Sequence, residues 1–305
     1  MDETFRAEAL AGLRASPKRT SPKWFYDDEG SALFERITHL DAYYPPRLER
    51  EAFAAALPAV GERMAGAAIA EFGSGSSRKT RALIEAVRPS LYVPLDIAEG
   101  FLMEAAERLR ADAPGLDVRP VAADFTQAVT LPEAFRASER RLGFFPGSTI
   151  GNFDAGGAEA FLRRAHGTLG QGAAFLVSAD LAKDEAVMVR AYDDPEGITA
   201  AFNRNLLHRM NRELGADFDP SRFRHEARWN AEDSRIEMHL VSGLPQTVTV
   251  AGERIAFAEG ESIHTENSHK YTQEGFAALA DRAGWRVGDA WTDGSEGFGV
   301  FLLRG

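Results

Sequence analysis

The sequence of 305 residues contains no cysteine, which excludes a disulfide framework and a thiolate metal site. It has no apolar run near the ~18 residues that a membrane helix needs, and its amino terminus lacks the apolar stretch of a signal peptide. Basic residues are in the minority, because 35 Lys and Arg stand against 46 Asp and Glu, for a formal net charge of -11. That balance argues against binding to a nucleic-acid backbone.

The remaining composition is that of an ordinary globular protein, with 44% hydrophobic and 27% charged residues. The length suffices for one large domain or two moderate ones. The seven histidines are scattered, and His264 and His269 do not have the i, i+4 spacing of a helical metal pair. We therefore expect a cytoplasmic, monomeric protein without a metal ion, a nucleic-acid partner or a membrane contact.

A glycine loop is the segment around which the chain is organised. The apolar run Ala67–Phe72 predicts a buried strand, Gly73-Ser74-Gly75 follows it, and a helical pattern begins at Ser77. Glycines let the backbone turn sharply and let a ligand approach, and the helix start directs unpaired N–H groups at the turn. This arrangement indicates a nucleotide-type cofactor site. Taken alone, the loop fits an ordinary tight turn about as well.

The residues after the loop indicate which cofactor binds. Arg78 stands where the dinucleotide fingerprint requires its third glycine, whereas Glu71-x-Gly-x-Gly is the pattern of S-adenosylmethionine (SAM) methyltransferases. Asp96 ends a second apolar run about 20 residues further on, where ribose hydroxyls need an acceptor. Asp124 and Phe125 end a third run and suit an adenine. The three strand ends together favour SAM.

The order of elements predicts an α/β fold. Strands near 67–72, 91–95, 117–121, 141–145 and 173–179 alternate with helices near 77–87, 98–112 and 156–168, which indicates a parallel sheet with helices on both faces. Segments 285–291 and 297–303 predict a closing hairpin with an antiparallel strand. We expect a Rossmann-like class I SAM methyltransferase sheet.

The strand–helix alternation stops after Asp180, where two helices and then several strands are predicted. We expect a discontinuous second domain of α+β type, which binds the substrate and forms a lid over the strand ends. Its predicted ranges are 1–60 and 183–272, and those of the methyltransferase domain are 61–182 and 273–305.

Candidate substrate-binding residues lie in two places: after the fourth predicted strand, and in the segment that precedes the first strand of the sheet. Asn152 lies in a glycine-containing turn at the carboxyl end of that strand; substrate binding and simple helix capping or turn formation explain it equally well. Tyr26 and Tyr43 are candidates because a buried phenol needs a hydrogen-bond partner. For the neighbouring Trp24 and Phe25, core packing is an equally good explanation.

Five sequence blocks carry a resemblance to a known family: Ser21–Ser31, Tyr43–Arg47, Glu71–Arg81, Phe145–Phe153 and Thr265–Ser268. With these blocks the chain resembles, along nearly its whole length, the histidine-specific Nα-methyltransferases of ergothioneine biosynthesis. The glycine block alone indicates only SAM binding. The tyrosine blocks, Gly-x-Thr-Ile-Gly-Asn and Glu-x-Ser are much more specific.

The resemblance implies transfer of three methyl groups from SAM to the α-amino group of L-histidine. The products are hercynine (histidine betaine) and S-adenosylhomocysteine. It also implies a set of cofactor-binding residues: Glu71, Gly73, Ser74, Gly75 and Lys79 around the loop, Asp96 at the ribose, and Asp124 with Phe125 at the adenine.

The resemblance likewise implies how histidine is held. Asn152 matches the residue at the α-amino group, and Asn152 and Tyr26 are the expected catalytic residues. The other expected contacts are Tyr26 and Tyr192 near the carboxylate, Tyr43, Glu266 and Ser268 around the imidazole, and Phe34, Gly147, Thr149 and Met238 along the pocket. One departure is Asn267, where the family pattern has a small apolar residue.

These roles are chemically coherent, because methyl transfer needs a neutral amine. Asn152 can form a hydrogen bond with an amine, and it carries no negative charge that would raise the pKa of that amine. Glu266 can accept the imidazole N–H, and Ser268 can supply a second polar contact. The sequence indicates no general base.

Two other functions stay open. The chain could methylate another amino acid such as tryptophan, although Glu266 and Met238 stand where an indole would need room. It could also be a SAM-binding module without catalysis. A dehydrogenase is a weaker hypothesis because the third glycine is missing, and NAD binding would revive it.

Overall fold

The computed structural model describes residues 2–74 and 78–305, and the chain divides into two compact units. Unit 1 comprises the residues up to Tyr44 together with Lys183–His269, and unit 2 comprises Pro45–Ala182 and Lys270–Gly305. Gly75, an expected cofactor residue, lies outside the described residues. None of the helices in the described part of the chain is long and apolar enough to cross a membrane.

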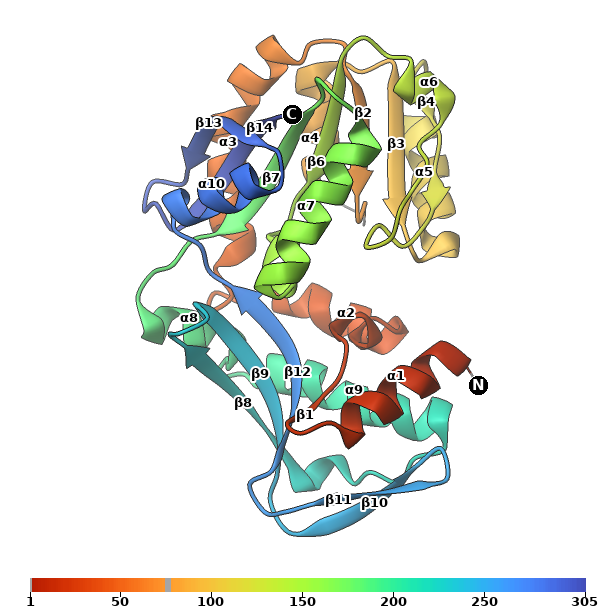
Figure 1. Ribbon diagram of the computed structural model, residues 1–305, viewed down its shortest axis with the longest axis vertical. Coiled ribbons are helices and arrows are strands. Elements are labelled where there is room, and N and C mark those ends of the chain that lie inside the picture. Colours follow the sequence, from red (N-terminus) through yellow and green to blue (C-terminus); the bar gives the residue numbers. More distant parts are fainter. Residues whose placement is uncertain (1, 75–77) are drawn as a thin grey trace. The chain divides into compact units, whose positions relative to one another are not determined.

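Unit 2 is built on an eight-stranded sheet (Figure 1). The strands run parallel except at one edge, where β14 is antiparallel to both β7 and β13. Their order is β13 (Arg286–Thr292), β14 (Phe298–Arg304), β7 (Ala174–Asp180), β6 (Arg141–Phe145), β2 (Ala68–Phe72), β3 (Leu91–Asp96) and β4 (Asp117–Val118), with β5 (Val121–Ala122) also beside β3. This order confirms the predicted Rossmann-like sheet with its closing antiparallel hairpin.

Helices cover both faces of this sheet, which explains why every residue of β2 and β7 is buried. On one face, Phe161 of α7 (Ala155–Leu169) and Phe276 of α10 (Gln273–Arg282) join a core with Phe72, Phe145 and Phe175. On the other face, α3 packs against β13, β14 and α4. The helices of unit 2 are α3 (Pro45–Arg63), α4 (Arg78–Val87), α5 (Glu99–Asp112), the short α6 (Glu133–Arg136), α7 and α10.

The boundary between the units differs from the predicted one. Residues up to 60 were expected to belong to the second domain, but α3 belongs to unit 2 from its first residue, Pro45. The reason is apolar packing: Phe53 of α3 stacks on Phe144 of β6 with the ring centroids 5.5 Å apart. The second segment of unit 1 ends at His269, and not at residue 272 as predicted.

Unit 1 contains a four-stranded sheet with helices. The sheet order is β1 (Lys18–Arg19), β12 (Ser262–His269), β9 (Arg235–Ser242) and β8 (Phe223–Asn230), and a separate hairpin joins β10 (Gln246–Val250) to β11 (Glu253–Phe257). The helices are α1 (Glu3–Arg14), α2 (Asp28–Ile37), α8 (Glu185–Tyr192) and α9 (Ile198–Leu214). The buried side of α9 packs against α2, β8 and β9.

A β-bulge divides the residues of β12 between the two faces of this sheet. His264 pairs with His239, whereas Glu266 pairs with Met238, so Thr265 is the extra residue. Its hydroxyl donates a hydrogen bond to the Met238 carbonyl at 3.0 Å. Because directly paired residues share a face and neighbours along a strand alternate, Glu266 and Met238 lie on one face and the two histidines on the other.

Candidate functional site

The glycine loop of unit 2 begins at the carboxyl end of β2, next to an aromatic ring. Gly73 has φ +73°, and a Cβ at this position would meet Cε1 of Phe125 at 3.4 Å. The Phe125 ring is held in turn by Phe72 and Phe145, with ring centroids 6.4 and 5.8 Å away. The structure thus brings Gly73 and Phe125 together, and the left-handed backbone explains why glycine is needed.

The two other predicted cofactor acids stand at neighbouring strand ends. The N–H groups of Gly73 and Ser74 both donate to the carbonyl of Leu95, at 2.9 and 3.1 Å, which ties the loop to the residue before Asp96. Asp96 itself accepts from Ala98 N at 3.0 Å. Asp124 accepts from the N–H and the hydroxyl of Thr126, at 2.8 and 2.6 Å. Local hydrogen bonds therefore fix both carboxylates.

Glu71 lies fully buried beneath the loop. It accepts hydrogen bonds from the Thr80 hydroxyl at 2.8 Å and the Tyr92 hydroxyl at 2.8 Å. Burial raises the pKa of Glu71 to about 8, although both hydrogen bonds act to lower it. Through these hydrogen bonds Glu71 connects β2, β3 and α4 beneath the glycine loop.

Glu49 of α3 is a further residue of this edge, which the sequence analysis missed. Its buried carboxylate accepts from Lys79 Nζ at 2.6 Å and from Gly147 N at 2.6 Å. It therefore links the start of α4 to the turn after β6. An acid between Leu48 and Ala52 on the buried side of α3 is the signal that could have found it.

The turn after β6 presents Asn152. The backbone is left-handed at Gly147 and Ser148, and a 3-10 helix, η2, spans Thr149–Asn152. The Thr149 hydroxyl is used within the turn, since it donates to the Pro146 carbonyl at 3.1 Å. Helix α7 is capped by Asp154 instead of Asn152. Helix capping thus does not explain Asn152, whereas its place at the end of η2 leaves turn formation open as an explanation beside substrate binding.

Unit 1 gathers the predicted substrate tyrosines. Consecutive edge-on contacts join Tyr26 to Phe34, Phe34 to Tyr43 and Tyr43 to Tyr192, with ring centroids 5.6, 6.4 and 5.7 Å apart. The Tyr192 hydroxyl is hydrogen-bonded to the Ser268 hydroxyl at 2.7 Å. The structure therefore brings these five predicted residues into one cluster, which we call the tyrosine cluster.

Glu266 is an electrostatic neighbour of the tyrosine cluster. Burial of the Tyr26 hydroxyl and then the negative charge of Glu266 raise the pKa of Tyr26 well above its usual value. The Tyr26 side chain is nevertheless 44% exposed and makes no hydrogen bond with the described residues. A protonated phenol and a carboxylate thus lie near each other, and Met238 is the direct strand partner of Glu266.

Trp24 and Phe25, beside the tyrosine cluster, are core residues. Trp24 stacks on Phe5 with ring centroids 4.4 Å apart, and its indole N–H donates to Glu8. Phe25 stacks on Phe202 at 4.6 Å. Core packing is therefore the correct explanation for both.

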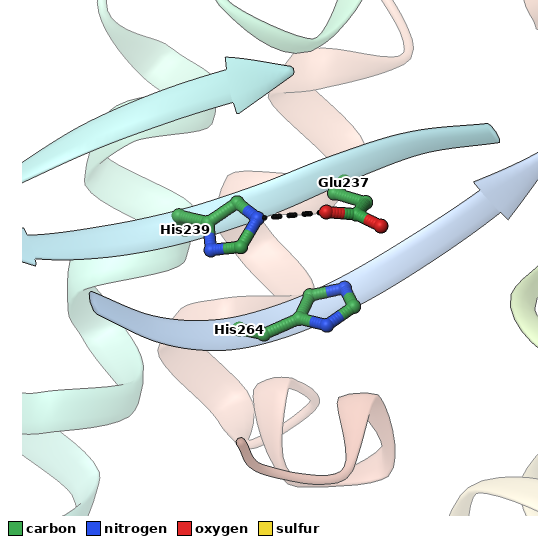
Figure 2. A group of neighbouring side chains, drawn as sticks. All are labelled: Glu237, His239 and His264. Atoms are coloured by element: carbon green, nitrogen blue, oxygen red, sulfur yellow. Dashed lines mark hydrogen bonds and ion pairs between the residues drawn. The ribbon is translucent and has the colours of Figure 1, made fainter. Parts of the chain in front are cut away.

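The opposite face of the unit 1 sheet carries a second polar cluster, formed by Glu237, His239 and His264 (Figure 2). Burial would raise the pKa of Glu237, but hydrogen bonds from Asn230 and Arg235 outweigh it and lower the pKa to about 2. Burial lowers the pKa of His239 to about 4 and also lowers that of His264. The carboxylate is therefore ionised and both rings are neutral near pH 7. The sequence analysis missed this cluster because His264 is distant in sequence from the other two residues.

Comparisons with known proteins indicate one family over nearly the whole chain. A family model described as "Histidine-specific methyltransferase, SAM-dependent" matches residues 5–305. The histidine N-alpha-methyltransferases of Mycolicibacterium smegmatis and Mycobacterium tuberculosis are each 41% identical to this chain. The alignments cover 98% and 97% of it, respectively, and 94% of either relative. The ergothioneine biosynthesis protein 1 of Neurospora crassa is 28% identical over 94% of this chain and 33% of its own length.

Proposed function

Because the chain belongs to the family of histidine-specific, SAM-dependent methyltransferases, we propose that it methylates the α-amino group of L-histidine. Three successive transfers would give hercynine for ergothioneine biosynthesis. SAM is the methyl donor and S-adenosylhomocysteine is the product. Support for histidine as the substrate comes from the names of the two relatives with 41% identity.

The tyrosine cluster with Glu266 is the observation that carries this proposal. An imidazole offers one N–H donor and one acceptor nitrogen, and the cluster offers the Glu266 carboxylate, the Ser268 hydroxyl and tyrosine hydroxyls. The Tyr26 hydroxyl stays protonated and can donate to a substrate carboxylate. Phe34 and Met238 supply apolar walls. We propose that unit 1 recognises the amino acid with these residues.

The cofactor edge of unit 2 fits SAM. Gly73 leaves room where a Cβ would touch Phe125, and the fixed carboxylates of Asp96 and Asp124 suit ribose and adenine donors. We propose that these residues, with Ser74, Gly75 and Lys79, hold SAM, and that Glu71 braces their loop. SAM supplies an electrophilic methyl group to this edge when it is bound.

Asn152 supports the choice of an amine as the nucleophile. Its amide can accept from and donate to an amino group, and it adds no charge that would favour the unreactive ammonium form. Correct placement of the nitrogen and exclusion of water then lower the barrier. We propose that Asn152 holds the α-amino group, with Thr149 and Gly147 shaping the turn beside it.

The test is to incubate the purified protein with SAM and histidine and to follow the product by mass spectrometry. A gain of three methyl groups is expected, and Glu266→Ala and Asn152→Ala should lower the turnover. If SAM binds but histidine is unchanged, the substrate proposal fails, and the same assay with tryptophan and the other amino acids separates another specificity from a module that only binds. We also propose a cytoplasmic monomer, which cell fractionation and light scattering would check.

A further inference from the structure

The cluster of Glu237, His239 and His264 offers three metal-ligand atoms that all lie within 4.8 Å of one another (Figure 2). Two imidazole nitrogens and one carboxylate oxygen are a donor set that Zn²⁺ binds in proteins. We propose that this cluster is a binding site for one divalent transition-metal ion, with Zn²⁺ as the best fit. It lies in unit 1, on the sheet face opposite Met238 and Glu266, so it does not depend on the proposed histidine recognition.

The backbone holds the three side chains on one rigid face. Glu237 and His239 are two residues apart on β9 and therefore point to the same side. His264 is the direct partner of His239 on the neighbouring strand β12. Their rings are nearly parallel, with the centroids 4.9 Å apart. A site on two hydrogen-bonded strands needs little ordering when an ion enters.

The ring nitrogen of His264 that faces Glu237 and His239 is Nε2, and Nδ1 lies on the other side of the ring (Figure 2). Nε2 lies 3.2 Å from the carbonyl oxygen of Glu266, and a carbonyl only accepts, so Nε2 donates this long hydrogen bond as long as no ion is bound. An ion would replace that hydrogen bond, and the ring would then carry its proton on Nδ1.

Both ring nitrogens of His239 have a hydrogen-bond partner. Its Nδ1 lies 3.1 Å from the Ser262 hydroxyl and its Nε2 lies 3.1 Å from Oε2 of Glu237. With an ion bound, Nδ1 would donate to Ser262 and Nε2 would ligate. Two donor atoms 3.1 Å apart are close to the spacing of neighbouring ligands on an ion with bonds of about 2.0–2.2 Å.

The Glu237 carboxylate is oriented by its second oxygen. Oε1 accepts from Arg235 Nε at 2.8 Å and from Asn230 at 2.9 Å, so Oε2 is the atom that faces His239. The positive charge of Arg235 is shared with Asp233 at 3.1 Å, and the nearby Arg228 is paired with Glu226. These acids offset the repulsion that two guanidinium groups would exert on a cation.

A fourth donor is available beside the three ligands. Asn267 is the strand partner of Glu237, and its buried Oδ1, which lies near the His264 ring, makes no hydrogen bond of ordinary geometry with the described residues. A buried oxygen without a partner is costly. A metal ion or an ion-bound water would satisfy it and complete a four-coordinate site.

The experiment uses the tag-free full chain, stripped with a chelator and dialysed. Isothermal titration with ZnCl₂ and elemental analysis after equilibrium dialysis should give one ion per chain. His264→Ala and Glu237→Gln should weaken binding at least tenfold, and Ser262→Ala roughly tenfold, because supports of ligating histidines contribute that much. His208→Ala is the matched control, since His208 is exposed on α9 of the same unit; it should bind Zn²⁺ like the original chain.

Two further measurements keep the proposal falsifiable if a variant fails to fold. Circular dichroism identifies such a variant, and Co²⁺ added to the unmodified chain should give the absorption bands of a nitrogen- and oxygen-ligated ion. Zn²⁺ should also raise the Tm of the unmodified chain and of His208→Ala, but not that of His264→Ala. The proposal is overturned if the unmodified chain binds no Zn²⁺, if folded His264→Ala binds it equally well, or if Co²⁺ keeps its aqueous spectrum.

Discussion

Lys79 Nζ donates a hydrogen bond to the buried carboxylate of Glu49 at 2.6 Å, and the other oxygen of that carboxylate accepts from Gly147 N at the same distance. Glu49 lies on α3, Lys79 at the start of α4 and Gly147 after β6. One carboxylate thus connects the helix that follows the glycine loop to the turn that presents Asn152. We therefore propose Glu49 as a positioning residue for the SAM site proposed at this edge.

Replacing Glu49 by Gln should therefore weaken SAM binding. Gln keeps an acceptor for Gly147 N but removes the anionic partner of Lys79, and a hydrogen bond to a charged group contributes about 1.5–3 kcal/mol. We expect the Kd for SAM, measured by calorimetry, to rise roughly tenfold to a hundredfold. Glu51→Gln is the control, because Glu51 is an exposed acid on the same helix. Equal SAM affinity in the two folded variants would contradict the positioning role.

The buried Glu71 predicts a pH dependence of stability. Its pKa of about 8 in the folded protein is above the usual 4.5 of a glutamate side chain, so the folded state binds more protons than the unfolded state. The stabilisation is complete below the unfolded pKa and is lost as the pH rises through that of the folded protein. Between pH 5 and pH 8 this group should lower the free energy of unfolding by on the order of 3 kcal/mol.

Glu71→Gln removes that titration and should make the free energy of unfolding, measured with urea, depend less on pH over this range. The exposed Glu85 on α4 provides the control Glu85→Gln, which should keep the original pH dependence. If Glu71→Gln and the unmodified chain lose equal stability between pH 5 and pH 8, Glu71 is ionised in the folded protein.

An ion pair inside unit 2 gives a third prediction. Lys270 Nζ lies 2.7 Å from the Asp180 carboxylate, and both side chains are almost fully buried. Lys270→Met leaves the Asp180 charge without this partner and should lower the free energy of unfolding by about 3–5 kcal/mol. The double variant Lys270→Met with Asp180→Asn should recover part of this loss, because no buried charge remains. A double variant less stable than Lys270→Met would show that Asp180 is held by its other contacts.

The main sheet could be predicted from the sequence because it is covered on both faces. Strands such as β2 and β7 are continuous apolar runs, and the helices between them keep a regular spacing. The end of the first segment of unit 1, at Tyr44, could not be predicted in this way. The sequence shows that α3 is a helix with an apolar side, but only the contact of Phe53 with Phe144 assigns it to unit 2.

The same difference separates the site residues that the sequence could predict from those that it could not. Gly73, Asp96 and Asp124 follow apolar runs, and this position alone marks them in the sequence. Glu49 and the histidine cluster depend on contacts between distant segments, and His264 reaches the face of His239 only because Thr265 adds a bulge. A one-residue bulge exchanges the faces of a strand and leaves no clear signal in a single sequence.

The proposed role of Asn152 leads to a prediction about pH. Asn152→Asp puts a carboxylate beside the substrate amine, which raises the pKa of the amine and lowers its neutral fraction at neutral pH. A shift of one pKa unit would lower the rate about tenfold on the acidic side of the profile and move the rise in rate to higher pH. Asn152→Ala removes the contact without adding a charge. It should lower the rate at every pH and leave the shape of the profile unchanged.

The measurement is kcat/KM for histidine between pH 6 and pH 10 at saturating SAM, with SAM affinity measured for each variant. Asn152→Asp should recover activity relative to Asn152→Ala as the pH rises, because hydroxide in the solvent then deprotonates the amine in both. Profiles of the same shape for the two variants would show that residue 152 does not contact the amine. In that case the half-buried amide after β6 has another role, and the proposed orientation of histidine has to be abandoned, while SAM binding at the glycine loop is unaffected.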